Sequence, residues 1–235
     1  MATAVWGACA HATLYTYDFN GINALIPDGD VNGYQNSQSV TGPFNHGPND
    51  TSEIVDVNVT LSISGGYNGD LYGYLVHSSG FAVLVNRVGR ISGDAFGYAD
   101  TGFDVTIDGQ ASGHTVNDIH LYRAAGNSPA FSSGRLTGSW LEDGRADDPD
   151  AVTGNTANRN ALLSSFNALS ASGTWTLFLA DLSFGEQSTL NSWGLQISTV
   201  PEPVNRALLG LAGLFAGANC FILLRRRRRK CSRLW

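Results

Sequence analysis

The middle of this sequence has no cysteine. Only Cys9, Cys220 and Cys231 occur among the 235 residues, and all three lie near the ends. Neither a disulfide framework nor a thiolate metal site can therefore form within the stretch 10–219. Methionine and lysine occur once each, whereas 28 glycines and many Asn, Ser, Thr and Asp residues favour turns over helices. A chain of this length can bury one sizeable core, and we expect an all-β domain with appendages.

Positive charge is scarce before Val200. That part of the chain, which we call the body, has six Arg and no Lys against 19 acidic residues, a formal charge of −13. Eight of the 14 basic residues lie at or after Arg206. A body this acidic repels nucleic acid and anionic membrane surfaces. We therefore exclude nucleic acid as a partner and expect cations among the body's charged partners.

Recognisable catalytic motifs are also missing. The sequence has no G-x-S-x-G, no H-E-x-x-H and no G-T-S-M-A-like serine segment. The four histidines between residue 12 and Val200 have no paired spacing, and we interpret them as ordinary surface or core residues; they are His46, His77, His114 and His120. We expect a protein that is not an enzyme. A hydrolase with a carboxylate pair in the acidic stretch 142–150 stays open as an alternative.

A long uncharged run lies near the C-terminus. Residues 207–224 form 18 uncharged positions, about 27 Å as a helix, which is close to the hydrocarbon thickness of a bilayer. A basic cluster follows directly and is typical of a membrane stop with the positive side in the cytoplasm. This pattern predicts a single transmembrane helix with the body outside; a buried core helix is the alternative. The stop residues are Arg225, Arg226, Arg227, Arg228 and Arg229.

The N-terminus has part of an export signal. Its short apolar run ends in Ala10-His11-Ala12, an A-x-A pattern like a signal-peptidase site, but a basic region before the run is missing. We interpret residues 1–12 as a truncated signal peptide whose true beginning lies upstream. An ordinary N-terminus is the alternative.

A three-residue motif precedes the uncharged run. Pro201, Glu202 and Pro203 are followed by the Gly- and Leu-rich span and the arginines, and the two prolines keep this segment extended. In this order the three features resemble the PEP-CTERM sorting signal of bacterial envelope proteins, over residues 200–235. The resemblance implies cleavage near the motif by an exosortase-type transpeptidase, and therefore a transient membrane anchor. It also implies a destination at the outer surface or exopolysaccharide matrix of a Gram-negative bacterium.

The body reads as a series of strands. In Val55–Ile63 the odd positions are apolar and the even positions polar, which is the period of a half-buried strand. We expect a short helix near Arg159–Leu169 and a long polar loop over 143–160. Many short strands without βαβ alternation favour a sandwich or jelly roll. The other predicted strands are Leu71–Val76, Phe81–Val85, Phe103–Ile107, Trp175–Ala180 and Trp193–Ile197, and we expect the two Trp that begin the last two to share one core.

Two blocks of the body resemble a known domain. Residues 69–80, GDLYGYLVHSSG, are similar to the G-D-L-x-x-x-L-x-S-P-x-G of the P domain (P/Homo B domain) of kexin- and furin-like subtilases, with Ser79 in place of Pro. Residues 172–197 resemble that domain's last hairpin, and residues 26–29 with Gly33 resemble an opening turn of related bacterial modules. The resemblance spans residues 18–199 and implies a galactose-binding-like jelly-roll β-sandwich. The hairpin matches are Gly173, Trp175, Leu177, Asp181, Gly185, Glu186, Leu190, Trp193 and Leu195.

Acidic residues at strand ends are candidate ligands of a cation. Asp70 follows Gly69, and Asp181 ends its predicted strand, so that each can bind a loop amide or a cation. The stretch DGDVNG, residues 28–33, begins like an EF-hand loop, but Ser39 stands where the bidentate carboxylate belongs, and an Asx-rich turn is the alternative. If the body binds Ca²⁺, we expect its ligands among Asp70, Asp100, Asp104, Asp181 and Glu186.

These patterns together predict a non-catalytic, exported envelope or matrix protein that acts as a structural or binding module. We expect its loops to contact exopolysaccharide or another matrix protein. The alternative is an accessory P domain that associates with a separately encoded, secreted subtilisin-like serine protease.

Overall fold

The computed structural model describes residues 12–42, 53–154 and 158–200, and within these it confirms the all-β prediction. Three short 3-10 helices accompany the strands: η1 (Asn68–Asp70), η2 (Ile119–Leu121) and η3 (Leu163–Phe166). No helix of the described residues is long and apolar enough to cross a membrane, and the predicted span 207–224 lies outside them. The strands are β1 (Thr13–Phe19), β2 (Ala24–Leu25), β3 (Tyr34–Val40), β4 (Glu53–Gly65), β5 (Leu71–His77), β6 (Gly80–Asn86), β7 (Gly102–Asp108), β8 (Phe131–Ser132), β9 (Arg135–Trp140), β10 (Gly173–Asp181) and β11 (Ser188–Val200).

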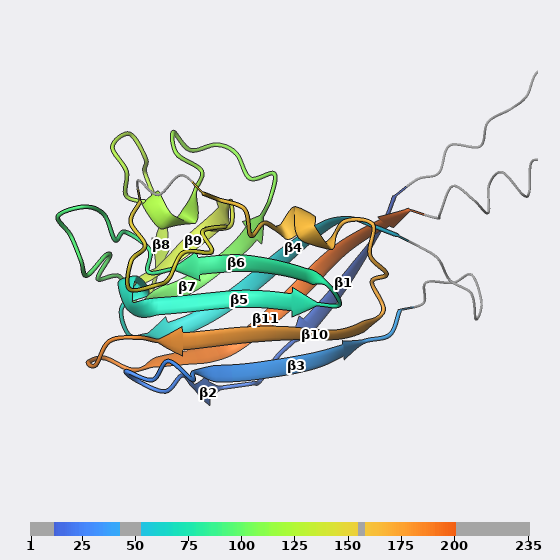
Figure 1. The fold of residues 1–235 in the computed structure, drawn as a ribbon, viewed down its shortest axis with the longest axis horizontal. Coiled ribbons are helices and arrows are strands. Elements are labelled where there is room, and N and C mark those ends of the chain that lie inside the picture. Colours follow the sequence, from blue (N-terminus) through green and yellow to red (C-terminus); the bar gives the residue numbers. More distant parts are fainter. Residues whose placement is uncertain (1–11, 43–52, 155–157, 201–235) are drawn as a thin grey trace, which may run out of the picture. The chain divides into compact units, whose positions relative to one another are not determined.

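The strands form two sheets. One has the order β1-β11-β4-β7-β9-β8, with β2 also paired to β11, and the other has the order β3-β10-β5-β6. All pairs are antiparallel except β7 with β9. In Figure 1 the four-stranded sheet lies in front of β7, β4, β11 and β1. Consecutive strands β10 and β11 belong to different sheets, so the connection between them crosses from one layer to the other at one end.

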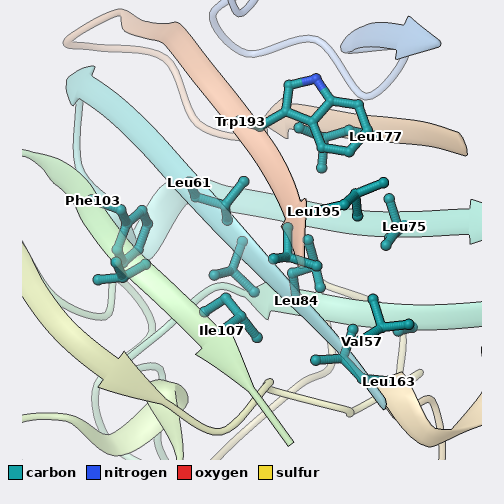
Figure 2. Packing of buried hydrophobic residues seen from close by; sticks show 14 of the residues in the cluster. Val57, Leu61, Leu75, Leu84, Phe103, Ile107, Leu163, Leu177, Trp193 and Leu195 are labelled. Atoms are coloured by element: carbon teal, nitrogen blue, oxygen red, sulfur yellow. The ribbon is translucent and has the colours of Figure 1, made fainter. Parts of the chain in front are cut away.

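The core lies between the two sheets. Figure 2 shows Leu61 and Leu195 of one sheet packed near Leu75 and Leu177 of the other, and all four side chains are almost fully buried. The side chains of a strand alternate between the two faces, so each sheet contributes every second residue to this layer. The result is a sandwich-like body with one continuous hydrophobic core.

Both predicted core tryptophans lie in this cluster. The indole of Trp175 is fully buried and stacks on His77 with ring centroids 4.1 Å apart, and its Nε1–H donates to the Ala171 carbonyl at 3.0 Å. The Trp193 Nε1–H donates to Asn36 Oδ1 at 2.8 Å. Each buried indole therefore satisfies its single donor. The strands begin earlier than predicted, however, because β10 starts at Gly173 and β11 at Ser188.

Strand β4 departs from the predicted alternation at one residue. Val57, Leu61 and their inward neighbours are buried as expected, but Val55 is exposed and Ile54 is buried instead. The pairing with β11 jumps from Asp56 to Ile54 across one step of the partner strand, which leaves Val55 as the extra residue of a β-bulge. A bulge shifts the side-chain alternation by one position. The placement of Val55 on the inner face was therefore wrong.

The segment before β10 is not the predicted helix and loop. The only helical turn within 159–169 is η3, which has four residues. The stretch 143–160 was expected to be a polar loop, yet its Asp143 and Arg145 are buried. The charged side chains of this segment have buried partners, which sequence periodicity does not reveal.

Candidate binding surface

The Gly69–Asp70 pair lies where a loop packs closely on η1. A Cβ atom at Gly69 would lie 2.2 Å from the Phe96 carbonyl oxygen, so no larger residue fits there. The Gly69 N–H donates to the Tyr98 carbonyl at 2.8 Å. Glycine therefore allows the 96–98 loop to approach η1, and this brings its aromatic side chains beside Asp70.

Asp181 lies next to this pair. It ends β10 and pairs with Leu71, the first residue of β5, and the Leu182 N–H donates to the Asp70 carbonyl at 2.9 Å. Its side chain is fully buried, and neither carboxylate oxygen has a hydrogen-bond partner within normal geometry. The Ser183 N–H and the Ser188 hydroxyl lie near enough to act on it only weakly. Burial, and then the charges of Asp70 and Asp28, raise the pKa of Asp181 to about 6.

Arg87 is the cation in this group of carboxylates. Its NH2 lies 3.5 Å from Asp70 Oδ1, and the same nitrogen donates to Ser183 Oγ at 3.0 Å. Its NH1 lies 3.7 Å from Asp150 Oδ1, and its Nε–H donates to the Gly69 carbonyl. Burial raises the pKa of Asp70, although the Ser183 hydroxyl and the Arg87 charge act in the opposite direction. The guanidinium therefore joins three loops around one acidic centre.

An aromatic groove opens beside Asp70. It has a volume of about 340 Å³, and we call it the loop-end groove. Phe96 and Phe184 are 80% and 87% exposed, far more than is usual for phenylalanine. The Phe184 ring lies over Gly29, where a Cβ atom would meet it at 2.6 Å. The lining residues are Tyr67, Asp70, Phe96, Gly97, Tyr98, Ala99, Ser183 and Phe184.

A second groove lies on the outer face of the four-stranded sheet. Tyr72, Tyr74 and Phe178 point outward from β5 and β10, and the rings of Tyr74 and Phe178 stack with centroids 4.7 Å apart. This sheet-face groove has a volume of about 410 Å³. Its lining is Val31, Tyr72, Tyr74, Asp148, Pro149, Asp150, Phe178 and Leu182.

The two grooves are neighbours. Leu182 of the sheet-face groove precedes Ser183 of the loop-end groove in the chain. Arg87 contacts Asp150 of the sheet-face groove and Asp70 of the loop-end groove, so its ion pairs link the linings of the two grooves. Aromatic side chains with a few convergent polar groups are typical of binding sites. The arrangement can therefore receive one extended ligand that contacts both grooves.

The structure separates the predicted calcium ligands. Asp70 and Asp181 come together, whereas Asp100 pairs with Arg123 and accepts the Tyr122 hydroxyl at 2.7 Å. Within residues 12–42, 53–154 and 158–200 no group of three or more His, Cys, Asp or Glu side chains is arranged to hold a metal ion. Calcium binding stays a prediction. The remaining two candidates are Asp104, which lies 3.4 Å from Arg135 on the other sheet, and Glu186, which is exposed in the β10–β11 connection.

The DGDVNG stretch forms the Asx-rich turn. Asp30 Oδ1 accepts the backbone N–H of Asn32 at 2.9 Å, and Asp28 accepts the Gly185 N–H at 3.2 Å. The Asp28 contact ties this turn to the β10–β11 connection. The predicted processing motif Pro201–Pro203 and the predicted stop residues, arginines 225–229, lie outside the described residues.

Sequence reasoning missed a buried charge network around His120. Its Nδ1 lies 2.7 Å from Asp143 Oδ2 and its Nε2 lies 2.9 Å from the Arg90 carbonyl oxygen, and both charged side chains are fully buried. Burial alone would lower the pKa of His120, but Asp143 and the Arg90 carbonyl raise it above its usual value. Arg145 binds Asp143 at 3.0 Å and Asp118 at 2.6 Å. Both imidazole nitrogens thus face acceptors, as in a structural imidazolium, and no free lone pair is left for general-base catalysis.

The chain was compared with known protein families, sequences and structures. No family model matches the chain, and no curated protein sequence matches it. Among solved structures, the serine protease of Aeromonas sobria in complex with its chaperone (ORF2) is similar with 14% identity and a TM-score of 0.43, over 82% of this chain and 28% of that one. The serine protease of Aeromonas sobria is similar with 15% identity and a TM-score of 0.41, over 80% and 27%. The present chain spans little more than a quarter of the length of either match.

Proposed function

We propose that this chain is a non-catalytic, exported module that binds an extended polysaccharide of the cell envelope or extracellular matrix. One observation carries the proposal: the loop-end and sheet-face grooves are adjacent, aromatic and open to solvent. Sugar rings have apolar C–H faces that pack on aromatic rings, and hydroxyl groups that need polar partners. Tyr74 and Phe178 supply the first kind of contact, and Asp148 and Ser183 supply the second.

The geometry favours a polymer over a small ligand. The two grooves together have more room than one sugar unit needs, and Leu182 of one lining and Ser183 of the other are consecutive residues. A linear chain can place successive units in both. Loops and sheet faces that a rigid sandwich positions are common places for recognition. We propose the galactose-binding-like jelly roll as the finer description of this sandwich, on the resemblance of residues 69–80 and 172–197.

The two ends of the chain fit this role. In the proposal the first twelve residues belong to an export signal, the span 207–224 holds the precursor transiently in the membrane, and the five arginines stop it there. An exosortase-type transpeptidase then cuts near Pro201-Glu202-Pro203 and releases the body to the outer surface.

The test is affinity electrophoresis of the full-length protein in detergent through gels that contain soluble polysaccharides. We expect at least one polysaccharide to retard the protein, and Tyr74→Ala and Phe178→Ala to reduce the retardation tenfold or more. Phe131→Ala is the matched control, because Phe131 is an exposed aromatic residue of β8 on the other sheet. Equal retardation of all three variants, or none with any polysaccharide, would refute the proposal.

The alternative is an accessory domain of a secreted subtilisin-like serine protease. It is favoured by the GDLYGYLVHSSG block, in which Gly69 and Asp70 support the loop-end groove. The aromatic side chains of that groove would then contact a catalytic partner. Recovery of a subtilase in stoichiometric amount with the protein from its native secretome, together with its loss in Phe184→Ala, would favour this alternative.

A further inference from the structure

Carboxylate groups outnumber guanidinium groups around Arg87, where the two grooves adjoin. In the part of the chain that the structure describes, four carboxylates act on one another or on Arg87, and the guanidinium groups that act together with them are those of Arg87 and Arg90. When all four carboxylates are ionised, two negative charges are in excess at one place on a body of formal charge −13. The four carboxylates are those of Asp28, Asp70, Asp150 and Asp181.

Asp181 gives a second, independent observation at the same place. Its side chain is fully buried beside Asp70, and neither oxygen has a hydrogen-bond partner within normal geometry, although the Ser183 N–H and the Ser188 hydroxyl act on it. A buried carboxylate without partners is costly to keep ionised, and a nearby positive charge offsets this cost. Arg87 is already bound to Asp70, Asp150, Ser183 and the Gly69 carbonyl, so it does not fully neutralise Asp181.

The rim of the loop-end groove suits an organic cation. Tyr67, Phe96, Tyr98 and Phe184 line it, and Asp70 lies in the same lining. Aromatic faces attract ammonium groups through the ring quadrupole, and cages of several aromatic rings are a known way to bind alkylated amines. A bare metal ion needs several oxygen ligands instead, and the described residues provide no group of three carboxylate, imidazole or thiolate side chains for one.

We propose that the loop-end groove binds the ammonium group of an amino sugar, so that the polysaccharide ligand is a cationic one with free amines. This inference rests on the proposed function and adds the chemical class of the ligand. The acidic body repels anionic polysaccharides, and the excess carboxylates near Asp70 distinguish an amine from a neutral N-acetyl group. The sugar ring packs on Phe184 and Phe96, while its ammonium group lies toward Asp70.

The experiment is calorimetric titration of the full-length protein in detergent with two oligosaccharides of equal length, a glucosamine hexamer and an N-acetylglucosamine hexamer. The titrations are run near pH 6, where an ordinary amine is protonated. We expect the glucosamine hexamer to bind at least about tenfold more tightly at low salt, and this preference to shrink at high salt.

Two variants and one control test whether the preference for the glucosamine hexamer arises in the loop-end groove. Asp70→Asn and Phe184→Ala should each remove most of the preference, and Phe184 is so exposed that its replacement leaves the core intact. Asp104→Asn is the control, because it removes the same charge from the outer face of the other sheet. It should leave the preference unchanged.

The outcomes separate this inference from the proposed function. Equal binding of both hexamers would overturn the ammonium site but keep a polysaccharide-binding module. A lysine-containing peptide that binds as tightly as the glucosamine hexamer would also overturn it, since the ligand would then be a polypeptide. Loss of the preference in Asp104→Asn would show a diffuse charge effect and no site. Binding of no polysaccharide at all would remove the proposed function itself.

Discussion

Replacement of Asp181 by asparagine should stabilise the protein. The pKa of Asp181 is about 6 in the fold against 3.8 for the free side chain, and each pKa unit corresponds to about 1.4 kcal/mol. The ionised carboxylate therefore costs the folded state up to about 3 kcal/mol near pH 8. The weak approach of Ser183 and Ser188 and the new buried amide reduce the expected gain to about 1–2 kcal/mol.

The stabilisation expected from Asp181→Asn depends on pH. Because the pKa of Asp181 is raised on folding, the folded state binds its proton more tightly, and the wild type loses stability as the pH rises from about 4 to above 6. Asp181→Asn removes this loss. The gain should be largest at pH 8 and should vanish only below about pH 3, where the carboxyl group is protonated in both the folded and the unfolded state.

The assay is thermal and urea unfolding of the full-length protein, followed by the fluorescence of buried tryptophans such as Trp175 and Trp193. For a domain of this size a gain of 1–2 kcal/mol raises Tm by about 2–8 °C. Asp104→Asn serves as the control, because its carboxylate is half exposed. A variant that is less stable than the wild type by the same amount at pH 4 and pH 8 would refute the reasoning, since Asp181 would then make favourable contacts.

Three further predictions concern other parts of the body. The imidazolium of His120 stabilises the fold below about pH 6.5, and this contribution is lost as the pH rises through its raised pKa, so His120→Gln should remove that part of the pH dependence in urea unfolding. Gly69→Ala should cost about 2 kcal/mol or more and lower Tm, because its Cβ would lie 2.2 Å from the Phe96 carbonyl oxygen. If Ca²⁺ binds at Asp70 and Asp181, the two of the five candidate ligands that the structure brings together, EDTA should lower the Tm of the wild type but not that of Asp181→Asn.

Much of the fold could be predicted from local patterns. The alternation in β4 and the apolar runs of β5, β6, β7 and β10 report directly which face of a strand is buried. Strand β3 has the sequence YQNSQSV and carries no such signal, because its outer face is polar and its inner face includes Asn36, which receives the Trp193 donor. The bulge at Val55 depends on pairing with Ser198 and Thr199 of β11, which lie more than 140 residues away. The sequence of one strand alone does not show which distant strand will pair with it or in which register.

The candidate site was predictable only in part, for the same reason. Sequence reasoning identified Asp70 and Asp181 because each lies at a strand end, and the resemblance of their motifs supported this. It could not place Phe96 and Phe184 in one groove, because each is a single exposed aromatic residue in a Gly-containing loop. The close approach of the 96–98 loop to Gly69 brings them together.

The two groups of buried charges in this body differ in a way that bears on function. Around His120 each carboxylate has a cation or several donors: Asp143 binds both His120 and Arg145, and Asp118 binds Arg145. That network is compensated and can serve the fold alone. Asp181 has no cation bound to it in this way, and we predict above that a neutral residue at the same place would be more stable. Proteins usually keep a destabilising group only where it has another use. This charge lies beside the exposed aromatic groove, and for this reason we propose that a ligand binds at Asp70, which lines the groove, and we assign His120 to structure.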